Sequence, residues 1–169
     1  VYADEEQTSN DSSTVRILFT HDLHDHIDSY RVTNTETRGP EVIGGYAQLA
    51  GTIAANRNDH TVLVDAGDFS MGTFYNALFE KSAPDLSLLG MMGYDATTLG
   101  NHEFDYRPAG LADMLNSAAS KSAEDKKTFE EENNGRYRFN AKNKPENPYK
   151  LPQMVNSNID MEATINDKE

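Results

Sequence analysis

Three short apolar segments of this chain are each followed at once by a cluster of polar side chains. The segments are residues 15–20, 61–64 and 94–99, and the polar residues after them include Asp22, His24, Asp65, Asp68, Asn101, His102 and Asp105. Helix signals lie between the segments, so the pattern predicts an α/β domain with parallel strands. In open sheets of this kind, ligands bind beyond the carboxyl ends of the strands, and we expect the three clusters to form one site.

The polar residues at the predicted strand ends have the chemistry of a metal site. Asp, His and Asn together offer oxygen and nitrogen ligands, a mixed set that suits Mn, Fe or Zn better than Ca or Mg. The chain has no cysteine, which excludes a thiolate site. Asp22 and His24 are two residues apart, so in an extended segment their side chains share a face and one ion can be held by both.

Each of these residues also has an ordinary structural explanation. An isolated Asp-x-His is more often a surface or capping arrangement, and an isolated Gly-Asp after a strand is more often just a turn. Asn101 followed by acidic residues also fits the N-cap of a helix. Asp65 is interpreted as structural, either as a turn residue or as an acceptor behind the ligands. The functional interpretation depends on the clusters occurring together.

The segments between the clusters predict helices and a core. Apolar residues recur at helical spacing from Tyr46 to Ala54. Residues 82–85 resemble a capping box with Pro84 in the first turn, and Gly93 suits the end of that helix. A further helix is expected to open at Pro108 and to face the core with Leu111, Met114 and Leu115. An aromatic-rich stretch is assigned to the core rather than to a base-stacking platform, and comprises Phe69, Met71, Phe74, Tyr75 and Phe79.

Four sequence blocks carry a resemblance to a known family. They are His21-Asp22-Leu23-His24, Gly44-Gly45-Tyr46-Ala47-Gln48-Leu49-Ala50, Val64-Asp65-Ala66-Gly67-Asp68, and Gly93-Tyr94-Asp95-Ala96 leading into Gly100-Asn101-His102-Glu103-Phe104-Asp105. In content and order they resemble the N-terminal half of the calcineurin-like metallophosphoesterases, in particular the exported 5′-nucleotidases and 2′,3′-cyclic-nucleotide phosphodiesterases. The resemblance covers about residues 15 to 117, with a weaker echo at 155–159. It implies an α/β fold that is part of a four-layer αββα sandwich.

The resemblance also implies the metal ligands. Asp22 and His24 would bind a first metal ion, Asp68 would bridge two ions, and Asn101 would bind the second. The implied cofactors are two divalent metal ions, Mn, Zn or Fe. Two such ions about 3.5 to 4 Å apart can clamp the attacking and leaving oxygens of a phosphoryl displacement, so a metal-bound hydroxide is the expected nucleophile.

The resemblance further implies a catalytic pair. His102 would lie outside the metal ligands and face the phosphate, where it would stabilise the transition state or protonate the leaving oxygen. Asp105 would accept a hydrogen bond from His102 and orient it. The family pattern does not include His21, Asp25 or His26. These are interpreted as spectators, with a supporting role or a bias in metal choice as the alternatives.

The chain carries only part of the expected ligand set. The resembled family completes its metal centre with histidines from the second half of the domain, and no histidine follows His102 here. We therefore expect the 169 residues to be a fragment, without the second half and without a C-terminal substrate domain. Residues 1–14 are predicted to be a disordered mature N-terminus after a signal peptide. Residues 15–169 are predicted to be the N-terminal half of the metallophosphoesterase domain, with a polar insertion at about 117–148.

Composition narrows the partners and the location. Lys and Arg number 15 against 28 Asp and Glu, a net charge of −13, which disfavours binding to nucleic acid or to anionic membranes. No apolar run approaches the roughly 20 residues that cross a bilayer. The small-residue ending of Val1-Tyr2-Ala3 resembles a signal-peptidase site. We expect a secreted or cell-surface bacterial protein.

The sequence therefore predicts a metal-dependent hydrolase of phosphate esters. An exported 5′-nucleotidase or 2′,3′-cyclic-nucleotide phosphodiesterase is favoured, while UDP-sugars and other phosphate esters remain open as substrates. Its expected partners are a nucleotide or other phosphate ester and the missing half of the domain. The alternative is a noncatalytic surface module that binds a metal or a phosphate, or a natural short protein that has lost catalysis.

Overall fold

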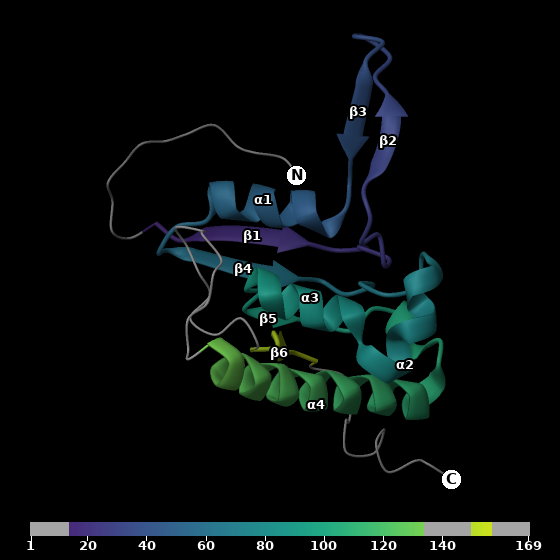
Figure 1. Ribbon diagram of the computed structural model, residues 1–169, viewed down its shortest axis with the longest axis vertical. Helices are drawn as coiled ribbons and strands as arrows, with labels where there is room; N and C mark the ends of the chain where they lie inside the picture. Colours follow the sequence, from purple (N-terminus) through teal and green to yellow (C-terminus); the bar gives the residue numbers. More distant parts are fainter. Residues whose placement is uncertain (1–13, 134–149, 157–169) are drawn as a thin grey trace.

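A four-stranded parallel sheet forms the centre of the fold. The computed structural model describes residues 14–133 and 150–156 (Figure 1). The strands lie in the order β1-β4-β5-β6, and they are β1 (Arg16–Thr20), β4 (Thr61–Asp65), β5 (Ala96–Thr97) and β6 (Gln153–Met154). All their pairings are parallel. The predicted α/β class is confirmed, and the first three strand ends lie at one edge of the sheet.

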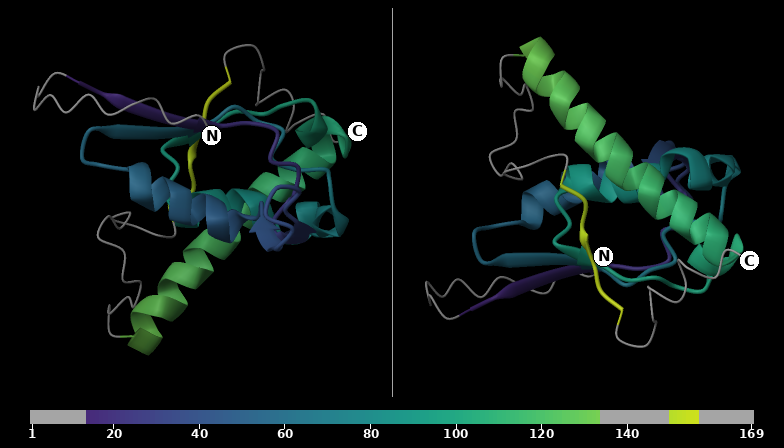
Figure 2. Two further views of the ribbon diagram at one scale, coloured as in Figure 1. Left: turned by 90° about the horizontal axis from the view of Figure 1, so that it is seen from above. Right: turned by 90° about the horizontal axis from the view of Figure 1, so that it is seen from below.

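Helices cover one face of this sheet. They are α1 (Tyr46–Asn56), α2 (Phe79–Ser82), α3 (Pro84–Met92) and α4 (Arg107–Asn133), with 3-10 helices η1 (Phe74–Leu78) and η2 (His102–Phe104). In both views of Figure 2, α1 and α4 lie on the same side of the strands. Among the described residues, no helix has the length and apolar character needed to span a membrane.

The core lies between the sheet and these helices. Leu63 of β4, Leu89 of α3 and the α4 residues Leu111 and Met114 are each at most 1 % exposed. Leu115 is half-buried and packs against the same cluster. The predicted inward face of the helix that contains Pro108 is therefore confirmed.

The opposite face of the sheet is apolar and exposed. Ile17 and Phe19 of β1 are 65 % and 68 % exposed, and Val62, which lies opposite Ile17 in β4, is 41 % exposed. In a strand, alternate side chains point to opposite faces, so these three residues share a face while Leu18 and Leu63 point into the core. No described helix or strand covers the exposed face in Figure 2.

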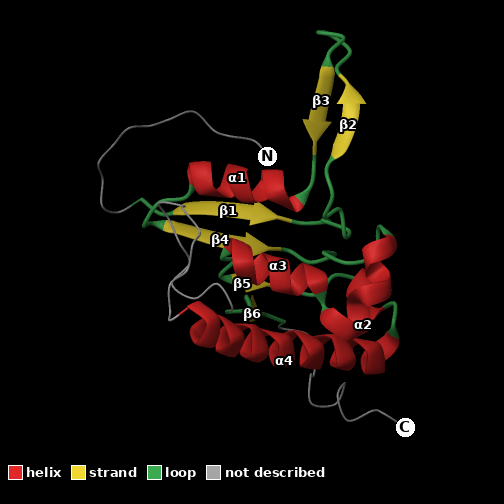
Figure 3. Cartoon of the chain, viewed as in Figure 1, coloured by secondary structure: helices red, strands yellow, loops and turns green. Residues whose placement is uncertain are grey.

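An antiparallel hairpin projects from the body of the molecule. It consists of β2 (Tyr30–Thr33) and β3 (Pro40–Ile43), and it connects β1 to α1 (Figure 3). Its strands are mostly exposed. The sequence patterns above contained no prediction of this hairpin.

One local feature was not predicted and one local prediction was wrong. The helix that begins at Arg107 continues to Asn133, so residues 117–133 of the predicted polar insertion are helical. The predicted capping box at Ser82 does not form, because the Ser82 hydroxyl bonds back to the carbonyl of Leu78 and the N-cap of α3 is Ala83. Pro84 is the first residue of α3 and Gly93 ends it with a φ of 81°, as predicted.

The aromatic-rich stretch is divided between core and surface. Phe69 and Phe79 are buried, as predicted, whereas Phe74 is 75 % exposed and stacks on Tyr75. The assignment of Phe74 to the core was wrong, because η1 turns its side chain away from the sheet. The predicted N-terminal segment 1–14 and the later part of the insertion fall almost wholly outside the described residues.

Candidate metal centre

The loops that follow β1 and β4 lie side by side at the end of the sheet. Three backbone hydrogen bonds join them, from the N–H groups of Asp22, His24 and Asp25 to the carbonyls of Gly67, Asp68 and Phe69, at 2.9 to 3.1 Å. The loop after β5 joins them through His102, whose N–H donates to Asp68 Oδ1 at 2.9 Å. The tertiary structure thus brings together the three polar clusters that were predicted to share a site.

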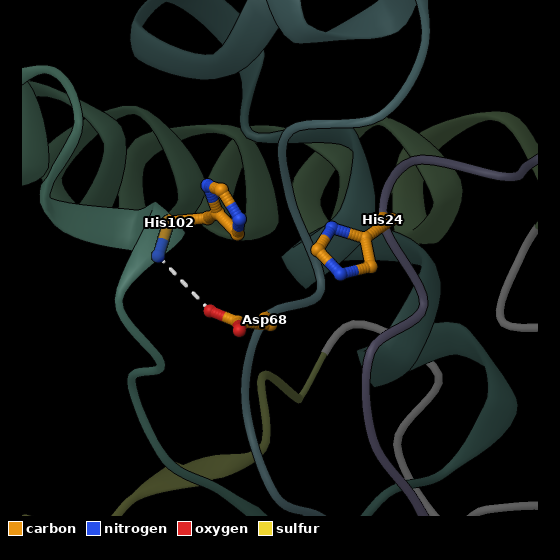
Figure 4. Close-up of side chains that lie close together, drawn as sticks. All are labelled: His24, Asp68 and His102. Atoms are coloured by element: carbon orange, nitrogen blue, oxygen red, sulfur yellow. Dashed lines mark hydrogen bonds between the residues drawn. The ribbon is translucent and has the colours of Figure 1, made fainter.

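His24, Asp68 and His102 form the centre of the site. Each offers one ligand atom, and these atoms all lie within 4.8 Å of one another. The two imidazole rings meet edge to face with their centroids 5.1 Å apart. Figure 4 shows the two rings on either side of the Asp68 carboxylate, with the His102 N–H directed at it. The imidazole of His24 and the carboxylate of Asp68 are donors that Mn, Fe and Zn accept.

A hydrogen bond fixes the orientation of His24. Its Nδ1 lies 3.0 Å from the carbonyl oxygen of Met71, which can only accept. In the neutral ring, Nδ1 therefore carries the proton and the lone pair is on Nε2. Metal-binding histidines are commonly oriented in this way by a carbonyl partner.

His102 is paired with Asp105. The Nδ1 atom of His102 lies 2.7 Å from Asp105 Oδ2, in the arrangement that the resemblance implied. This hydrogen bond is the main cause that raises the pKa of His102, and the charges of Asp105, Asp68 and Glu103 act in the same direction. His102 therefore favours its protonated, positively charged form more than an isolated histidine does.

The two other predicted ligands are Asp22 and Asn101. Asp22 is exposed, and its carboxylate contacts the Nδ1 atom of His21 at 3.1 Å. It is not one of the three clustered groups. Asn101 is exposed immediately before η2, and its side chain makes no capping bond. Asn101 therefore lies at the N-cap position, as the capping explanation expected, but its side chain does not cap the helix.

The backbone at the predicted ligands is strained. Asp22, His24 and Asp68 have φ values of 53°, 48° and 52°, in the left-handed region that disfavours residues with a Cβ. Such outliers persist only where the surroundings hold them, and they gather at functional sites. Gly67, with a φ of 91°, lies so close to the next loop that an added Cβ would be 2.5 Å from the N atom of Gly100.

Asp65 joins the ends of three neighbouring strands. Its Oδ2 accepts from the Thr20 hydroxyl at 2.6 Å, and its Oδ1 accepts from Thr97 and from the N–H of Gly67 at 3.0 Å. Burial raises the pKa of Asp65, although these hydrogen bonds oppose the shift. The interpretation of Asp65 as a structural acceptor agrees with this geometry.

The residues that depart from the family pattern differ in their surroundings. Asp25 is fully buried, and its Oδ2 accepts from the N–H groups of Met71 at 3.1 Å and Gly72 at 3.3 Å. Because the Met71 carbonyl is bonded to His24, this geometry favours the alternative in which Asp25 has a supporting role over its interpretation as a spectator. His26 is exposed and pairs with the Tyr30 hydroxyl.

The sequence analysis assigned no role to one residue of the site. Glu103 is fully buried between the loops after β4 and β5, and it accepts hydrogen bonds from both. A glutamate inside a block of ligand-type residues was the available signal.

A separate hollow of about 800 Å³ between α2 and α4 has no strand-end residue in its lining, which includes Lys81, Ser117 and Glu124.

The chain is similar to known phosphoesterases over a part of their length. No family model matches the chain. A snake venom 5′-nucleotidase of Gloydius brevicauda is 37 % identical over 106 residues, which are 62 % of this chain and 18 % of that protein. The trifunctional nucleotide phosphoesterase protein YfkN of Bacillus subtilis is 34 % identical over 147 residues, which are 86 % of this chain and 8 % of that protein.

A solved structure agrees with these relatives. The 5′-nucleotidase precursor from Thermus thermophilus superimposes with a TM-score of 0.51 and 31 % identity, over 60 % of this chain and 20 % of that one. The chain is a homologue of the nucleotide phosphoesterases. More closely, it is homologous to part of the 5′-nucleotidases and of the nucleotide phosphoesterase YfkN, and the expected resemblance to the 5′-nucleotidases is confirmed. It spans less than a fifth of the length of these curated relatives.

Proposed function

We propose that this chain is part of a metal-dependent phosphoesterase that hydrolyses nucleotides or related phosphate esters. The observation that carries the proposal is the convergence of His24, Asp68 and the His102–Asp105 pair at the strand ends. Homology to 5′-nucleotidases supports a nucleotide as the substrate. Secretion or a cell-surface location is proposed on the same homology.

The donor chemistry of the site fits divalent cations. Asp22, His24, Asp68 and Asn101 would hold two such ions, Mn, Zn or Fe, and the free Nε2 of His24 is directed by the bond to Met71. When bound, two ions would lower the pKa of a water molecule toward neutrality and neutralise charge on the phosphoryl oxygens. The remaining ligands would come from the second half of the domain in a longer protein.

His102 would act on the substrate directly. Asp105 holds the ring by its Nδ1 and raises the pKa of His102, so that Nε2 can present a proton toward a negatively charged oxygen. Such a proton would stabilise the transition state or pass to the leaving oxygen. Asp105 orients the ring and stabilises its charged form.

Replacing His102→Ala in the full-length protein tests this function. We expect kcat on 5′-AMP to fall by about 10²-fold or more, because the proton donor is lost. Bound metal, measured by elemental analysis, should change little. The matched control is His60→Ala, which removes an exposed histidine from the turn before β4.

Three outcomes would decide between the candidate functions. A normal kcat in the His102→Ala protein would reject the role assigned to His102. A full-length protein that binds metal but hydrolyses neither 5′-nucleotides, 2′,3′-cyclic nucleotides nor UDP-sugars would favour the noncatalytic binding module. A large loss in His60→Ala as well would point to general destabilisation.

A further inference from the structure

Glu103 is a buried carboxylate whose two oxygens are both used. Oε1 accepts from the N–H of Ser70 at 3.0 Å and from the Ser70 hydroxyl at 2.7 Å. Oε2 accepts from the N–H of Asp68 at 3.0 Å and from the N–H of Gly100 at 2.7 Å. All four partners are donors, so both side-chain oxygens of Glu103 act as hydrogen-bond acceptors.

These bonds connect two different loops. Asp68 and Ser70 belong to the loop after β4, and Gly100 belongs to the loop after β5. Hydrogen bonds from backbone N–H groups to a carboxylate are stronger than those between neutral groups, and burial strengthens them further. Glu103 therefore holds the two loops at a fixed separation beneath the cluster of His24, Asp68 and His102.

Asp68 is the residue at which the three loops of the site meet. Its N–H donates to Glu103, its carbonyl accepts from the N–H of His24 at 3.1 Å, and its Oδ1 accepts from the N–H of His102 at 2.9 Å. Its φ of 52° lies in a region that costs a residue with a Cβ about 1 kcal/mol or more. External hydrogen bonds must therefore keep Asp68 in this conformation.

We propose that Glu103 is a positioning residue of the candidate metal centre. Its carboxylate fixes the backbone of Asp68 and so fixes the direction of the Asp68 side chain between His24 and His102. The proposal rests on the proposed function, in which Asp68 is a metal ligand. Glu103 is not itself a ligand, because both of its oxygens are occupied by protein donors.

The substitution Glu103→Gln in the full-length protein tests this role. Glutamine keeps the volume, but its NH₂ group would face N–H or O–H donors at one of the two ends. We expect Mn²⁺ to bind about 10- to 100-fold more weakly by titration calorimetry, which is the usual effect of losing a residue that supports metal ligands. Hydrolysis of bis-p-nitrophenyl phosphate should fall at limiting Mn²⁺ and recover at high Mn²⁺.

Asp95→Asn provides a matched control. The Asp95 carboxylate also accepts from a backbone N–H, that of Leu63 at 2.8 Å, but it lies half-exposed at the far end of β5 from the metal cluster. This variant also loses a carboxylate that is bonded to strand β4. We expect it to bind Mn²⁺ like the unmodified protein even if its melting temperature falls.

Ser70→Ala provides a second variant in case Glu103→Gln does not fold. It removes one of the four donors to Glu103 and leaves the backbone bonds in place, so we expect a smaller weakening of Mn²⁺ binding, roughly threefold. Unchanged Mn²⁺ affinity in a folded Glu103→Gln protein would overturn the proposal. If that variant is unfolded, unchanged affinity in Ser70→Ala would overturn it.

The same measurements separate this proposal from the proposed function. An unmodified protein that binds Mn²⁺ more tightly than Glu103→Gln, yet hydrolyses no phosphate ester, would retain the positioning role and reject the enzyme. An active unmodified protein with equal affinity in Glu103→Gln would reject the positioning role alone. An unmodified protein that binds no Mn²⁺ would reject both.

Discussion

At the scale of single residues, the backbone of Gly100 limits the space around the Asp68 side chain. Gly100 lies directly beside Asp68, where an added Cβ would be 2.0 Å from Asp68 Oδ1. No real Cβ contact is that short, so any other residue at this position must displace the carboxylate. Position 100 in the Gly100-Asn101-His102 block therefore requires glycine, because there is no room for a Cβ atom.

We predict that Gly100→Ala impairs the full-length enzyme. Displacing the Asp68 carboxylate by about 1 Å should lower kcat/KM by about 10²-fold and weaken Mn²⁺ binding. Steady-state kinetics and metal titration measure both effects. Activity like that of the unmodified protein would show that Asp68 tolerates the movement.

Gly51→Ala is the control for this substitution. Gly51 lies in the middle of α1, with open space where its Cβ would be. Alanine is a better helix former than glycine, so the variant should be stabilised by about 0.5 to 1 kcal/mol with normal activity. Its melting temperature should rise slightly.

At the scale of helices and strands, a buried acidic side chain joins α1 to α3. The Tyr46 hydroxyl at the start of α1 donates to Asp85 Oδ1 in the first turn of α3 at 2.8 Å. Burial and the neighbouring Asp25 carboxyl raise the pKa of Asp85 to about 8. Asp85 is therefore mostly protonated in the folded protein at neutral pH.

This shift predicts that stability falls as pH rises. The usual pKa of aspartate in an unfolded chain is about 3.9, so between pH 4 and pH 8 the unfolded state loses a proton that the folded state keeps. The contribution of Asp85 to the free energy of unfolding should decrease across this window, by a total on the order of a few kcal/mol, and then level off.

Asp85→Asn should remove this pH dependence. The amide of asparagine resembles the protonated carboxyl and cannot ionise, so the variant should be more stable than the unmodified protein at pH 8 and similar to it at pH 4. Urea denaturation at both values measures the difference. Parallel stability curves for the two proteins would contradict the raised pKa of Asp85.

The sequence patterns predicted the positions of the strands and helices better than they predicted the lengths of these elements. The strands at residues 16–20 and 61–65 match their apolar runs, because β-branched and other apolar residues favour strands whether or not both faces are covered. The β5 strand is only Ala96–Thr97, because few of its residues pair with the neighbouring strands β4 and β6. Helix α4 continues beyond its apolar pattern because Lys and Glu residues are good helix formers.

The exposed face of the sheet matters at the scale of the whole molecule. Ile17, Phe19 and Val62 form an apolar surface on β1 and β4 that no described element covers. Contiguous apolar surfaces of this kind mark an interface or lead to association. Since the relatives are several times longer than this chain, we expect the surface to be covered by a further part of the protein.

We predict that residues 1–169 produced alone self-associate. Replacing Ile17→Lys and Phe19→Lys together should shift the isolated segment toward a monomer in light scattering, because two charges interrupt the apolar face. In the full-length protein, the same double substitution should lower stability, because it would bury unpaired charges.

Phe74→Lys is the matched control for the sheet face. Phe74 is more exposed than Ile17 or Phe19 but lies in η1, away from the strands. It should change neither association nor stability. A monomeric, cooperatively melting segment 1–169 without substitutions would show that the sheet face needs no cover.

The sequence by itself determined the class of the fold and the composition of the site. Apolar runs that end in Asp, His and Asn define parallel strands with a shared edge. The pairing of His102 with Asp105 was implied by the family resemblance, and their spacing of three residues in a helical turn is compatible with it. Both are local properties, because strand formation and short-range contacts depend on neighbouring residues.

Only the tertiary structure decided which groups face one another. The contacts of Glu103 with Asp68 and Ser70, of Met71 with His24, and of Asp25 with Met71 join residues that are 33 to 47 positions apart. The exposure of Phe74 and the free apolar sheet face likewise depend on how the elements pack. Long-range contacts depend on the register of the strands and on the paths of the loops, which side-chain periodicity does not encode.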